Sequence, residues 1–362
     1  MADEGHFGGE DIMKITKVTE NGKIVAYKLE NENGMSVQIG TMGAALQRVD
    51  LPDGQGGTVN VCLNFEDMAD YAGNTLYAGA SVAPVAGRIA GSRFTIGNKI
   101  YPLTANDRGF SCLHGGTICA SFLEWIVMQA YARDGVAKVG LTTILPDDLE
   151  GFPGTRIFSA TYTLDNENRL TVDYDAVSDR DTYVNMTNHA YFNFSGDFSQ
   201  SAWNQKLTIA APNYMQLDEK NWPVGLDSVE DTPFDFREGK TIQAAVDAYP
   251  GNVQVVNGKG IDHAFDVREA AAAGGVLLQM EDEASGRGVK IKSTSGQCMV
   301  VYSGGFIGDA YKLDGGVQSS DRCAIALECQ AFPNAINMPE LDPQILEANE
   351  RYHHTIQYEF VF

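Results

Sequence analysis

Cysteine is scarce and irregularly spaced in this chain of 362 residues. The six cysteines lack the density and regular spacing of a disulfide framework, so we expect buried, reduced thiols; they are Cys62, Cys112, Cys119, Cys298, Cys323 and Cys329. Cys112 and Cys119 bracket His114, which suggests a zinc site, but the chain has neither a CxxC pair nor an HExxH motif. We therefore predict no metal and no other cofactor.

Basic residues are also few. The chain has 26 Lys and Arg but 48 Asp and Glu, which gives a net charge of −22. Nucleic-acid binding depends on basic side chains that neutralise phosphates, so we predict no nucleic-acid partner, and an anionic membrane surface is disfavoured too. No apolar run approaches the roughly 20 residues that cross a bilayer. The start of the chain, MADEGHFGGEDIMKI, lacks the pattern of a secretory signal. We predict a soluble, cytoplasmic protein.

Helical periodicity is sparse, and strand patterns occur almost everywhere. In RLTVDYDAV, residues 169–177, Leu170, Val172 and Tyr174 alternate with polar residues, and TIQYEFVF at the C-terminus alternates through Ile356, Tyr358, Phe360 and Phe362. Further strands are expected at 24–29, 36–39, 94–101, 137–144, 206–210 and 299–302. Short helices are expected at 237–249 and 270–273, with another helical turn near 343–348.

No repeat, low-complexity linker or charge block divides the chain. We predict an all-β fold, an extended antiparallel sandwich in one domain over residues 15–362, preceded by a flexible tail at 1–14. The concave face of such a sandwich is the natural place for a ligand.

Two side chains stand out chemically. NMTNHAYFN, residues 185–193, places His189 among amides, hydroxyls and aromatics where strand-like sequence stops. An imidazole with an ordinary pKa of about 6.5 exchanges protons near neutral pH. Glu328, in ALECQAFPNAIN, puts a charge where an apolar strand pattern predicts core residues. Together they suggest general acid–base chemistry.

At these points the chain resembles a known family. The motifs that carry the resemblance are, in chain order, GRIAGSRFTIGNKIYPL at 87–103, LHGG at 113–116, NMTNHAYFN at 185–193, GIDHAF at 260–265 and LECQAFPNAIN at 327–337. In order and rough spacing they are similar to the motifs of aldose 1-epimerases, the galactose mutarotases, from about residue 20 to the C-terminus. The resemblance implies a β-supersandwich, with large antiparallel sheets and a few short helices, that interconverts the α and β anomers of a free hexose.

The resemblance also implies roles for five residues. Glu328 would be the base that removes the proton from the C1 hydroxyl, and His189 the acid that protonates the ring oxygen. His114 would support the ring oxygen or a neighbouring hydroxyl, and Arg88 and Asp262 would bind sugar hydroxyls. The implied partner is a monosaccharide, bound by a monomer or homodimer. One base and one acid suffice for ring opening, each typically contributing about 10²- to 10⁴-fold.

Each of these residues also has a structural interpretation. His189 could satisfy backbone groups at a strand end, and Glu328 could pair with an arginine in a buried salt bridge. His114 could be a turn residue, Arg88 a packing arginine and Asp262 a turn or N-cap residue. Three other histidines, His263, His353 and His354, are expected to be structural or solvated, and Tyr191 and Phe192 to belong to the core.

The chain departs from the family pattern at three places. Gly87 stands where many members have asparagine, Val300 where a glutamine is frequent, and TICASFLEW follows LHGG in place of the usual segment. The acid–base pair is unaffected, and a sugar other than glucose or galactose is compatible with these changes. Two alternative functions remain: a carbohydrate-binding module without turnover, and an epimerase of a phosphorylated hexose, which would need a cluster of Arg or Lys.

Overall fold

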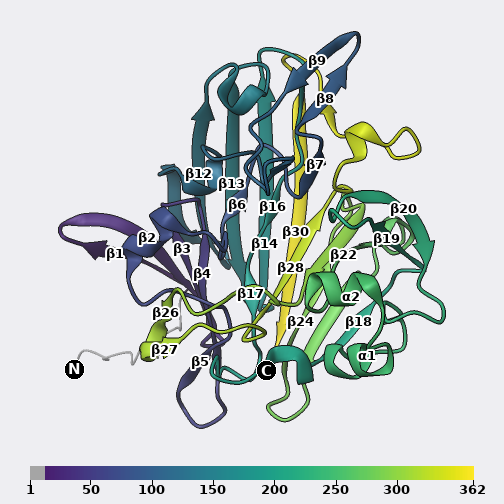
Figure 1. The fold of residues 1–362 in the computed structure, drawn as a ribbon. Coiled ribbons are helices and arrows are strands. Elements are labelled where there is room, and N and C mark those ends of the chain that lie inside the picture. The colour runs from purple at the N-terminus through teal and green to yellow at the C-terminus, as the bar shows by residue number, and fades with distance from the viewer. Residues whose placement is uncertain (1–12) are drawn as a thin grey trace, which may run out of the picture.

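The computed structural model describes residues 13–362, and antiparallel β-strands form most of it (Figure 1). Every ladder between named strands in this part of the chain is antiparallel, as the alternating patterns predicted. Residues 1–12 of the expected tail lie outside the described residues. The expected boundary at residue 15 is too late, because Met13 is buried in the core and the first strand, β1, begins at Lys14.

The largest sheet has nine strands and contains the longest ones. In spatial order they are β11 (Ile126–Arg133), β12 (Val136–Leu145), β13 (Arg156–Asp165), β14 (Arg169–Ser178), β30 (Arg351–Val361), β24 (Arg287–Lys292), β23 (Leu278–Asp282), β18 (Lys206–Ile209) and β21 (Lys240–Thr241). The C-terminal strand β30 thus lies between β14 and β24 and joins the middle of the chain to its last third.

Two further sheets complete the framework. The six-stranded sheet runs in the order β17 (Tyr191–Phe192), β28 (Ile325–Gln330), β25 (Cys298–Tyr302), β22 (Asp262–Asp266), β19 (Asn213–Leu217) and β20 (Pro223–Ser228). The five-stranded sheet is a meander of β1 (Lys14–Glu20), β2 (Lys23–Glu30), β3 (Ser36–Gly40), β4 (Leu46–Pro52) and β5 (Thr58–Asn60).

Short strand pairs and helices fill the connections. The pairs are β6 (Ser81–Val82) with β16 (Thr187–Asn188), β7 (Arg88–Ala90) with β10 (Ser111–Leu113), β8 (Arg93–Ile96) with β9 (Lys99–Pro102), β15 (Thr182–Tyr183) with β29 (Ile345–Leu346), and β26 (Lys312–Leu313) with β27 (Val317–Gln318). The α-helices of the described chain are α1 (Ile242–Ala248), α2 (Val253–Gly258) and α3 (Arg268–Ala272).

The alternation predicted along β14 and β30 is confirmed except at Phe362. Leu170, Val172 and Tyr174 are buried along β14, and the C-terminal pattern continues into the core as far as Phe360. Phe362 lies beyond the end of β30 and is 41% exposed, because the sheet has no partner for it there. The expected strand over 94–101 is a hairpin, β8 and β9, that turns at Gly97.

The helix predictions need three corrections. The expected helix at 237–249 begins only at Ile242, because Lys240–Thr241 pairs with β18 and the Thr241 side chain caps the helix. The turn expected near 343–348 is instead strand β29, which pairs with β15. Helix α2, capped by the Asn252 side chain, was not predicted. The helix expected at 270–273 is confirmed as part of α3.

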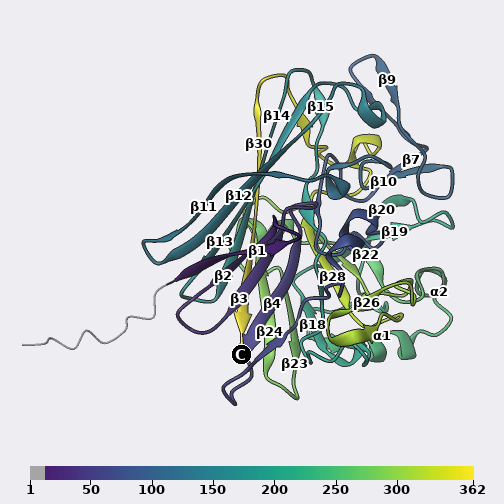
Figure 2. The ribbon, with the colours of Figure 1, turned by 90° about the vertical axis from the view of Figure 1, so that its left-hand side faces the viewer.

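One contiguous apolar cluster joins the sheets. It runs from Met13 to Phe360 and takes buried side chains from all three sheets, for example Leu51, Tyr174 and Leu327. Figure 2 shows β11–β14 and β30 of the nine-stranded sheet toward the left, and the β7–β10 pair at the right. The six-stranded sheet has one face on the core and the other toward the β7–β10 pair.

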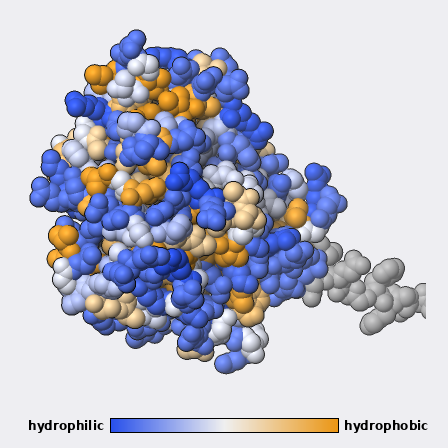
Figure 3. Space-filling view, turned by 90° about the vertical axis from the view of Figure 1, so that its right-hand side faces the viewer, coloured by the Kyte–Doolittle hydropathy of each residue, from blue (hydrophilic) through white to orange (hydrophobic). Residues whose placement is uncertain are grey.

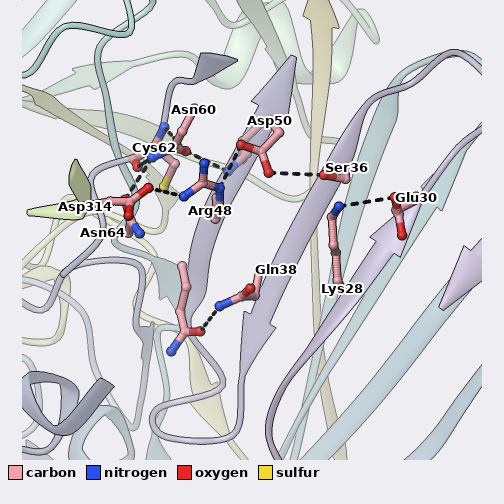
Figure 4. A network of polar contacts seen from close by, with 12 residues as sticks. Lys28, Glu30, Ser36, Gln38, Arg48, Asp50, Asn60, Cys62, Asn64 and Asp314 are labelled. Carbon is pink, nitrogen blue, oxygen red and sulfur yellow. Dashed lines mark hydrogen bonds and ion pairs between the residues drawn. The ribbon is translucent and has the colours of Figure 1, made fainter. Parts of the chain in front are cut away.

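Polar contacts tie the five-stranded sheet to a distant segment (Figure 4). Arg48 on β4 donates from Nε to the Asp50 carboxylate at 2.7 Å, and Ser36 donates to the same carboxylate at 3.2 Å. Arg48 also pairs with Asp314, which follows β26. These contacts fix the position of the β26–β27 hairpin beside β4.

Hydrophilic side chains dominate the face in Figure 3, where hydrophobic ones form small separate patches. No helix within residues 13–362 is long and apolar enough to span a membrane.

A buried polar network attaches the segment before His189 to the large sheet. Asn188 on β16 donates from Nδ2 to the Gly79 carbonyl at 2.9 Å and to the Tyr162 hydroxyl at 3.1 Å. Its Oδ1 accepts from the Ala190 amide. Ser81 on β6 bonds the hydroxyl of Tyr162 at 3.0 Å. All of these groups are buried, so each needs its partner.

We expect Asn188→Ala to lower the free energy of unfolding by about 1–3 kcal/mol, because the buried Ala190 amide is left without a partner. Urea unfolding followed by circular dichroism measures this change. The exposed Asn98, whose side chain makes no hydrogen bond within the described residues, provides the control, and Asn98→Ala is expected to change stability by less than about 0.5 kcal/mol. Equal effects of the two variants would contradict the structural role of Asn188.

Candidate active site

Successive residues of the central strands point to opposite faces of the six-stranded sheet. On β28, Leu327 and Cys329 join the main core, whereas Glu328 and Gln330 line a cavity on the other face. On β25, Val301 is in the core and Val300 lines the cavity. A side-chain period of two in a strand produces this division. The charge that interrupts the apolar pattern at residue 328 therefore faces the cavity.

Strand register brings distant residues into one row on the cavity face. Val300 lies directly opposite Glu328, and Ala264 directly opposite Val300. Tyr191 pairs with Ala326 on the other edge of β28, so continuing that register places His189 opposite Glu328. Cross-strand neighbours have Cβ atoms about 4.5–5.5 Å apart. The sheet thus places the histidine and the glutamate side by side, although 139 positions separate them in the sequence.

The cavity has a volume of about 280 Å³. This is near the lower end of the roughly 300–1,000 Å³ that is typical of small-molecule sites. The lining residues come from the six-stranded sheet, the β7–β10 pair and the connecting loops; they include Tyr77, Gly87, Arg88, Arg108, His114, His189, Tyr191, Met215, Leu217, Asn221, Asp262, Ala264, Val300, Tyr302, Phe306, Glu328 and Gln330. All five residues predicted from the sequence line this one cavity.

His189 and Glu328 are in direct contact. The distance from His189 Nε2 to Glu328 Oε1 is 3.5 Å, and the two residues are only 5% and 3% exposed. His189 Nδ1 and Glu328 Oε2 have no hydrogen-bond partner in the described structure. Glu328 makes no ion pair with an arginine among the described residues, in contrast to the salt bridge considered above. The pair therefore has unused polar atoms at the cavity wall.

Burial shifts the two proton affinities in opposite directions. Desolvation lowers the pKa of His189 to about 4. Desolvation, with a further contribution from Asp262, raises the pKa of Glu328 to about 8, while Arg88 acts the other way. Between these values the pair holds one proton, and these shifts place it on the Glu328 carboxyl, 3.5 Å from a neutral His189.

His114 lies next to this pair with a defined tautomer. Its Nδ1 accepts a hydrogen bond from the Gly87 amide at 3.2 Å, so the ring proton is on Nε2. Its ring lies 5.2 Å from that of His189, and burial holds its pKa well below the usual value. His114 has a φ of 50°, and a Cβ on Gly115 would lie 2.5 Å from Pro84 Cδ, which explains the glycine that follows. A neutral imidazole here is a hydrogen-bond donor.

Arg88 and Asp262 form the charged part of the cavity wall. Arg88 donates from Nε to Asp107 at 2.9 Å, and its Nη1 is 3.8 Å from Asp262. Burial raises the pKa of Asp262, although Arg88 opposes this shift. The arginine is thus held between two carboxylates, with donors left for a ligand. Asp107, which orients Arg88, was not predicted from the sequence.

Several lining residues escaped the sequence analysis because strand register, rather than a motif, places them. Tyr302 pairs with Asp262 across β25 and β22. Tyr191 belongs to a buried apolar cluster, as predicted, and it also lines the cavity. Phe192 belongs to the core as predicted. The sequence could have predicted that Tyr191 lines the cavity, because residues two apart in a strand point to the same face and Tyr191 is two residues after His189.

The other three histidines lie outside the cavity lining. His263 and His354 are buried, bonding Gln254 at 3.1 Å and Ser295 at 2.7 Å respectively, and His353 is exposed beside Asp175. All six cysteines are unpaired and buried, as expected.

Comparison with known proteins points to one family. A family model described as Aldose 1-epimerase matches residues 25–359. The chain is 32% identical over 340 residues to a galactose mutarotase of Mus musculus, covering 94% of each. It is 32% identical over 349 residues to an aldose 1-epimerase of Streptococcus thermophilus, covering 95% of each. A crystal structure of galactose 1-epimerase from Lactobacillus acidophilus superposes with a TM-score of 0.82 at 27% identity, covering 96% of this chain and 98% of that one.

The site geometry predicts how His189 titrates. In the folded protein we expect its imidazole to be half protonated at about pH 4, because burial disfavours the cation. Histidine NMR signals, assigned by comparison with His189→Asn, measure this midpoint. In the same protein unfolded by urea the midpoint should return to about 6.5. A folded-state midpoint at or above 6.5 would contradict the proposed desolvation.

Proposed function

The chain belongs to the aldose 1-epimerase family, and we propose that Glu328 and His189 carry out its reaction as base and acid. The protein is an isomerase that interconverts the α and β anomers of a hexose such as glucose or galactose. The observation that supports the residue roles is the 3.5 Å contact between the two side chains at the wall of one cavity.

Ring opening requires a proton to leave O1 while another reaches O5. Both oxygens are bonded to C1, so an acid and a base in contact with each other can each reach one of them. The proton shared by the pair first moves from Glu328 to His189, 3.5 Å away. Glu328 then takes the proton from O1, His189 donates its proton to O5, and the C1–O5 bond breaks to give the aldehyde. Rotation about C1–C2 exposes the other face of the carbonyl. Ring closure then reverses both transfers and returns each side chain to its starting state.

The remaining predicted residues bind and orient the sugar in this proposal. His114, with its proton on Nε2, donates to the ring oxygen or a neighbouring hydroxyl. Arg88 donates to sugar hydroxyls and Asp262 accepts from them, and a hydrogen bond to a charged group contributes about 1.5–3 kcal/mol. Asp107 holds the guanidinium of Arg88 in place. These contacts fix C1 beside the acid–base pair.

The two alternative functions fit less well. The relatives that match over nearly the whole chain are named for an enzyme activity rather than for binding alone. A phosphorylated sugar needs free cations, whereas the cavity-lining arginines of the described chain, Arg88 and Arg108, both lie within 4 Å of Asp107. This arrangement favours an uncharged substrate.

We also infer a single domain, because one buried cluster runs from Met13 to Phe360. A cytoplasmic location is consistent with six reduced, buried thiols. The net charge of −22 supports the absence of a nucleic-acid partner. The proposed state is a monomer or homodimer.

We expect Glu328→Gln and His189→Asn each to slow anomerisation by about 10²- to 10⁴-fold, because each removes one proton-transfer group. Polarimetry on freshly dissolved α-D-glucose and α-D-galactose measures the rate above the spontaneous one. The matched controls are Glu238→Gln and His353→Asn at exposed positions, which should retain the wild-type rate. A near-normal rate in either cavity variant, with its circular dichroism unchanged, would remove that residue from the mechanism.

The pH profile of kcat/KM should have a plateau between about 4 and about 8. Below about 4 the pair gains a second proton and has no base, whereas above about 8 it loses its last proton and has no acid. Initial rates in a series of buffers, corrected for the spontaneous reaction, measure the two limbs. A profile that rises or falls steadily from pH 5 to 7 would contradict the one-proton pair.

A further inference from the structure

One cross-strand row beside the acid–base pair carries unused hydrogen-bonding groups. It runs through Tyr191, Ala326, Tyr302 and Asp262, on β17, β28, β25 and β22. Ala326 and Glu328 are two residues apart on β28 and therefore point to the same face of the sheet. The three long side chains of the row, those of Tyr191, Tyr302 and Asp262, all line the cavity. This row is thus the immediate neighbour of the row that contains Glu328.

The side chain of Tyr302 is held at two points. Its ring meets the ring of Tyr191 edge to face, with centroids 6.0 Å apart, across the small side chain of Ala326. Aromatic pairs prefer this T-shaped arrangement. At the other end, the phenolic oxygen accepts a hydrogen bond from the Phe306 amide at 2.7 Å, and Phe306 also lines the cavity. The hydroxyl of Tyr302 is therefore positioned before a ligand binds.

This hydroxyl has a proton to donate. A phenol can donate one hydrogen bond and can also accept, and the bond from Phe306 uses only its accepting side. Within residues 13–362 the phenolic proton has no acceptor. Burial raises the pKa of Tyr302, and the negative charge of Asp262 adds to this shift, so the hydroxyl keeps its proton at neutral pH.

Asp262 provides the complementary acceptor. It lies directly opposite Tyr302, and residues paired in this way have Cβ atoms about 4.5–5.5 Å apart. The side chain of Asp262 is 20% exposed, and no group of the described chain donates a hydrogen bond to its carboxylate. The nearest cation, Arg88 Nη1, is 3.8 Å away. A donor and an acceptor thus line the cavity side by side without being bonded to each other.

We propose that Tyr302 is a further substrate-binding residue, which donates a hydrogen bond to the same sugar hydroxyl that donates one to Asp262. A hydroxyl both donates and accepts, so one hydroxyl satisfies both side chains. It is not the anomeric hydroxyl, because Glu328, which takes the proton from O1, lies in the next row. The inference rests on the proposed function, since it takes this cavity as the sugar site. Tyr302 then contributes to the choice of sugar rather than to proton transfer.

The size of the effect follows from the two hydrogen bonds. The bond to the charged Asp262 contributes about 10- to 10²-fold and the bond from the uncharged phenol about 2- to 10-fold. A sugar that lacks the shared hydroxyl loses both. The wild-type enzyme should therefore reject that deoxy sugar by about 20- to 10³-fold. Sites built to hydrogen-bond a substrate hydroxyl reject the analogue without it by as much as about 10⁴- to 10⁵-fold.

The test measures kcat/KM by polarimetry for D-glucose and its 2-, 3-, 4- and 6-deoxy analogues, each rate divided by the spontaneous rate of the same sugar. In the wild type we expect one analogue to show the large deficit. In Tyr302→Phe the value for D-glucose should fall about 2- to 10-fold while that analogue is unchanged, so the deficit narrows by the same factor. Asp262→Ala should narrow the deficit of the same analogue by about 10- to 10²-fold. The ratios for the other three analogues should stay constant in both variants.

Tyr352→Phe is the matched control. The hydroxyl of Tyr352 also accepts a hydrogen bond from a backbone amide, that of Met186 at 3.1 Å, but Tyr352 is not part of the cavity lining. This variant loses the same kind of bond to the main chain as Tyr302→Phe. It should leave all four deoxy ratios at their wild-type values.

The outcomes separate this proposal from the proposed function. If the wild type shows no large deficit for any analogue, or if all four ratios are unchanged in Tyr302→Phe, Tyr302 does not bind the sugar and only supports the loop after β25. Narrowing at different positions in Tyr302→Phe and Asp262→Ala would overturn the shared hydroxyl. In each of these cases the wild type still accelerates anomerisation. Failure to accelerate the anomerisation of any sugar, including D-galactose, would overturn the proposed function as well.

Discussion

The antiparallel register of β28 with its two neighbours is the constraint on which the site depends. It places Glu328 between His189 on one side and Val300 on the other, and it sends Leu327 and Cys329 into the core. A shift of one residue would bury the carboxylate in hydrocarbon and turn core side chains toward the cavity, so the apolar cluster itself enforces the register. The same residues that stabilise the sandwich therefore position the reactive pair.

The electrostatics of the site follow from that placement. An isolated charge on either of these two buried groups would cost free energy, because it has little access to water. Burial shifts their proton affinities in opposite directions, so the pair is most stable with one proton and no net charge. A buried pair of this kind needs no permanent counter-ion, and the guanidinium of Arg88 is instead held by Asp107 and Asp262 at the cavity wall.

The sequence was sufficient for the fold class and for strands in each of the three large sheets, and it identified five residues that line one cavity. Alternation along β14 and β30 was readable because each strand has one buried face, and the motif residues at 113–116 and 185–193 mark where strands stop. The extent of α1 was overestimated because tertiary pairing of Lys240–Thr241 with β18 overrides a local helical pattern. Asp107 and Tyr302 were missed because their positions depend on pairing between segments far apart in sequence, which local periodicity does not specify.

The polar network behind His189 has a consequence for how the protein loses function on heating. Asn188, Ser81 and Tyr162 connect the segment that carries His189 to β13 in the nine-stranded sheet, rather than to a peripheral loop. The segment that carries His189 therefore does not unfold separately from the sheet. Thermal inactivation should coincide with cooperative collapse of the whole sandwich, and no inactive but still folded intermediate should accumulate.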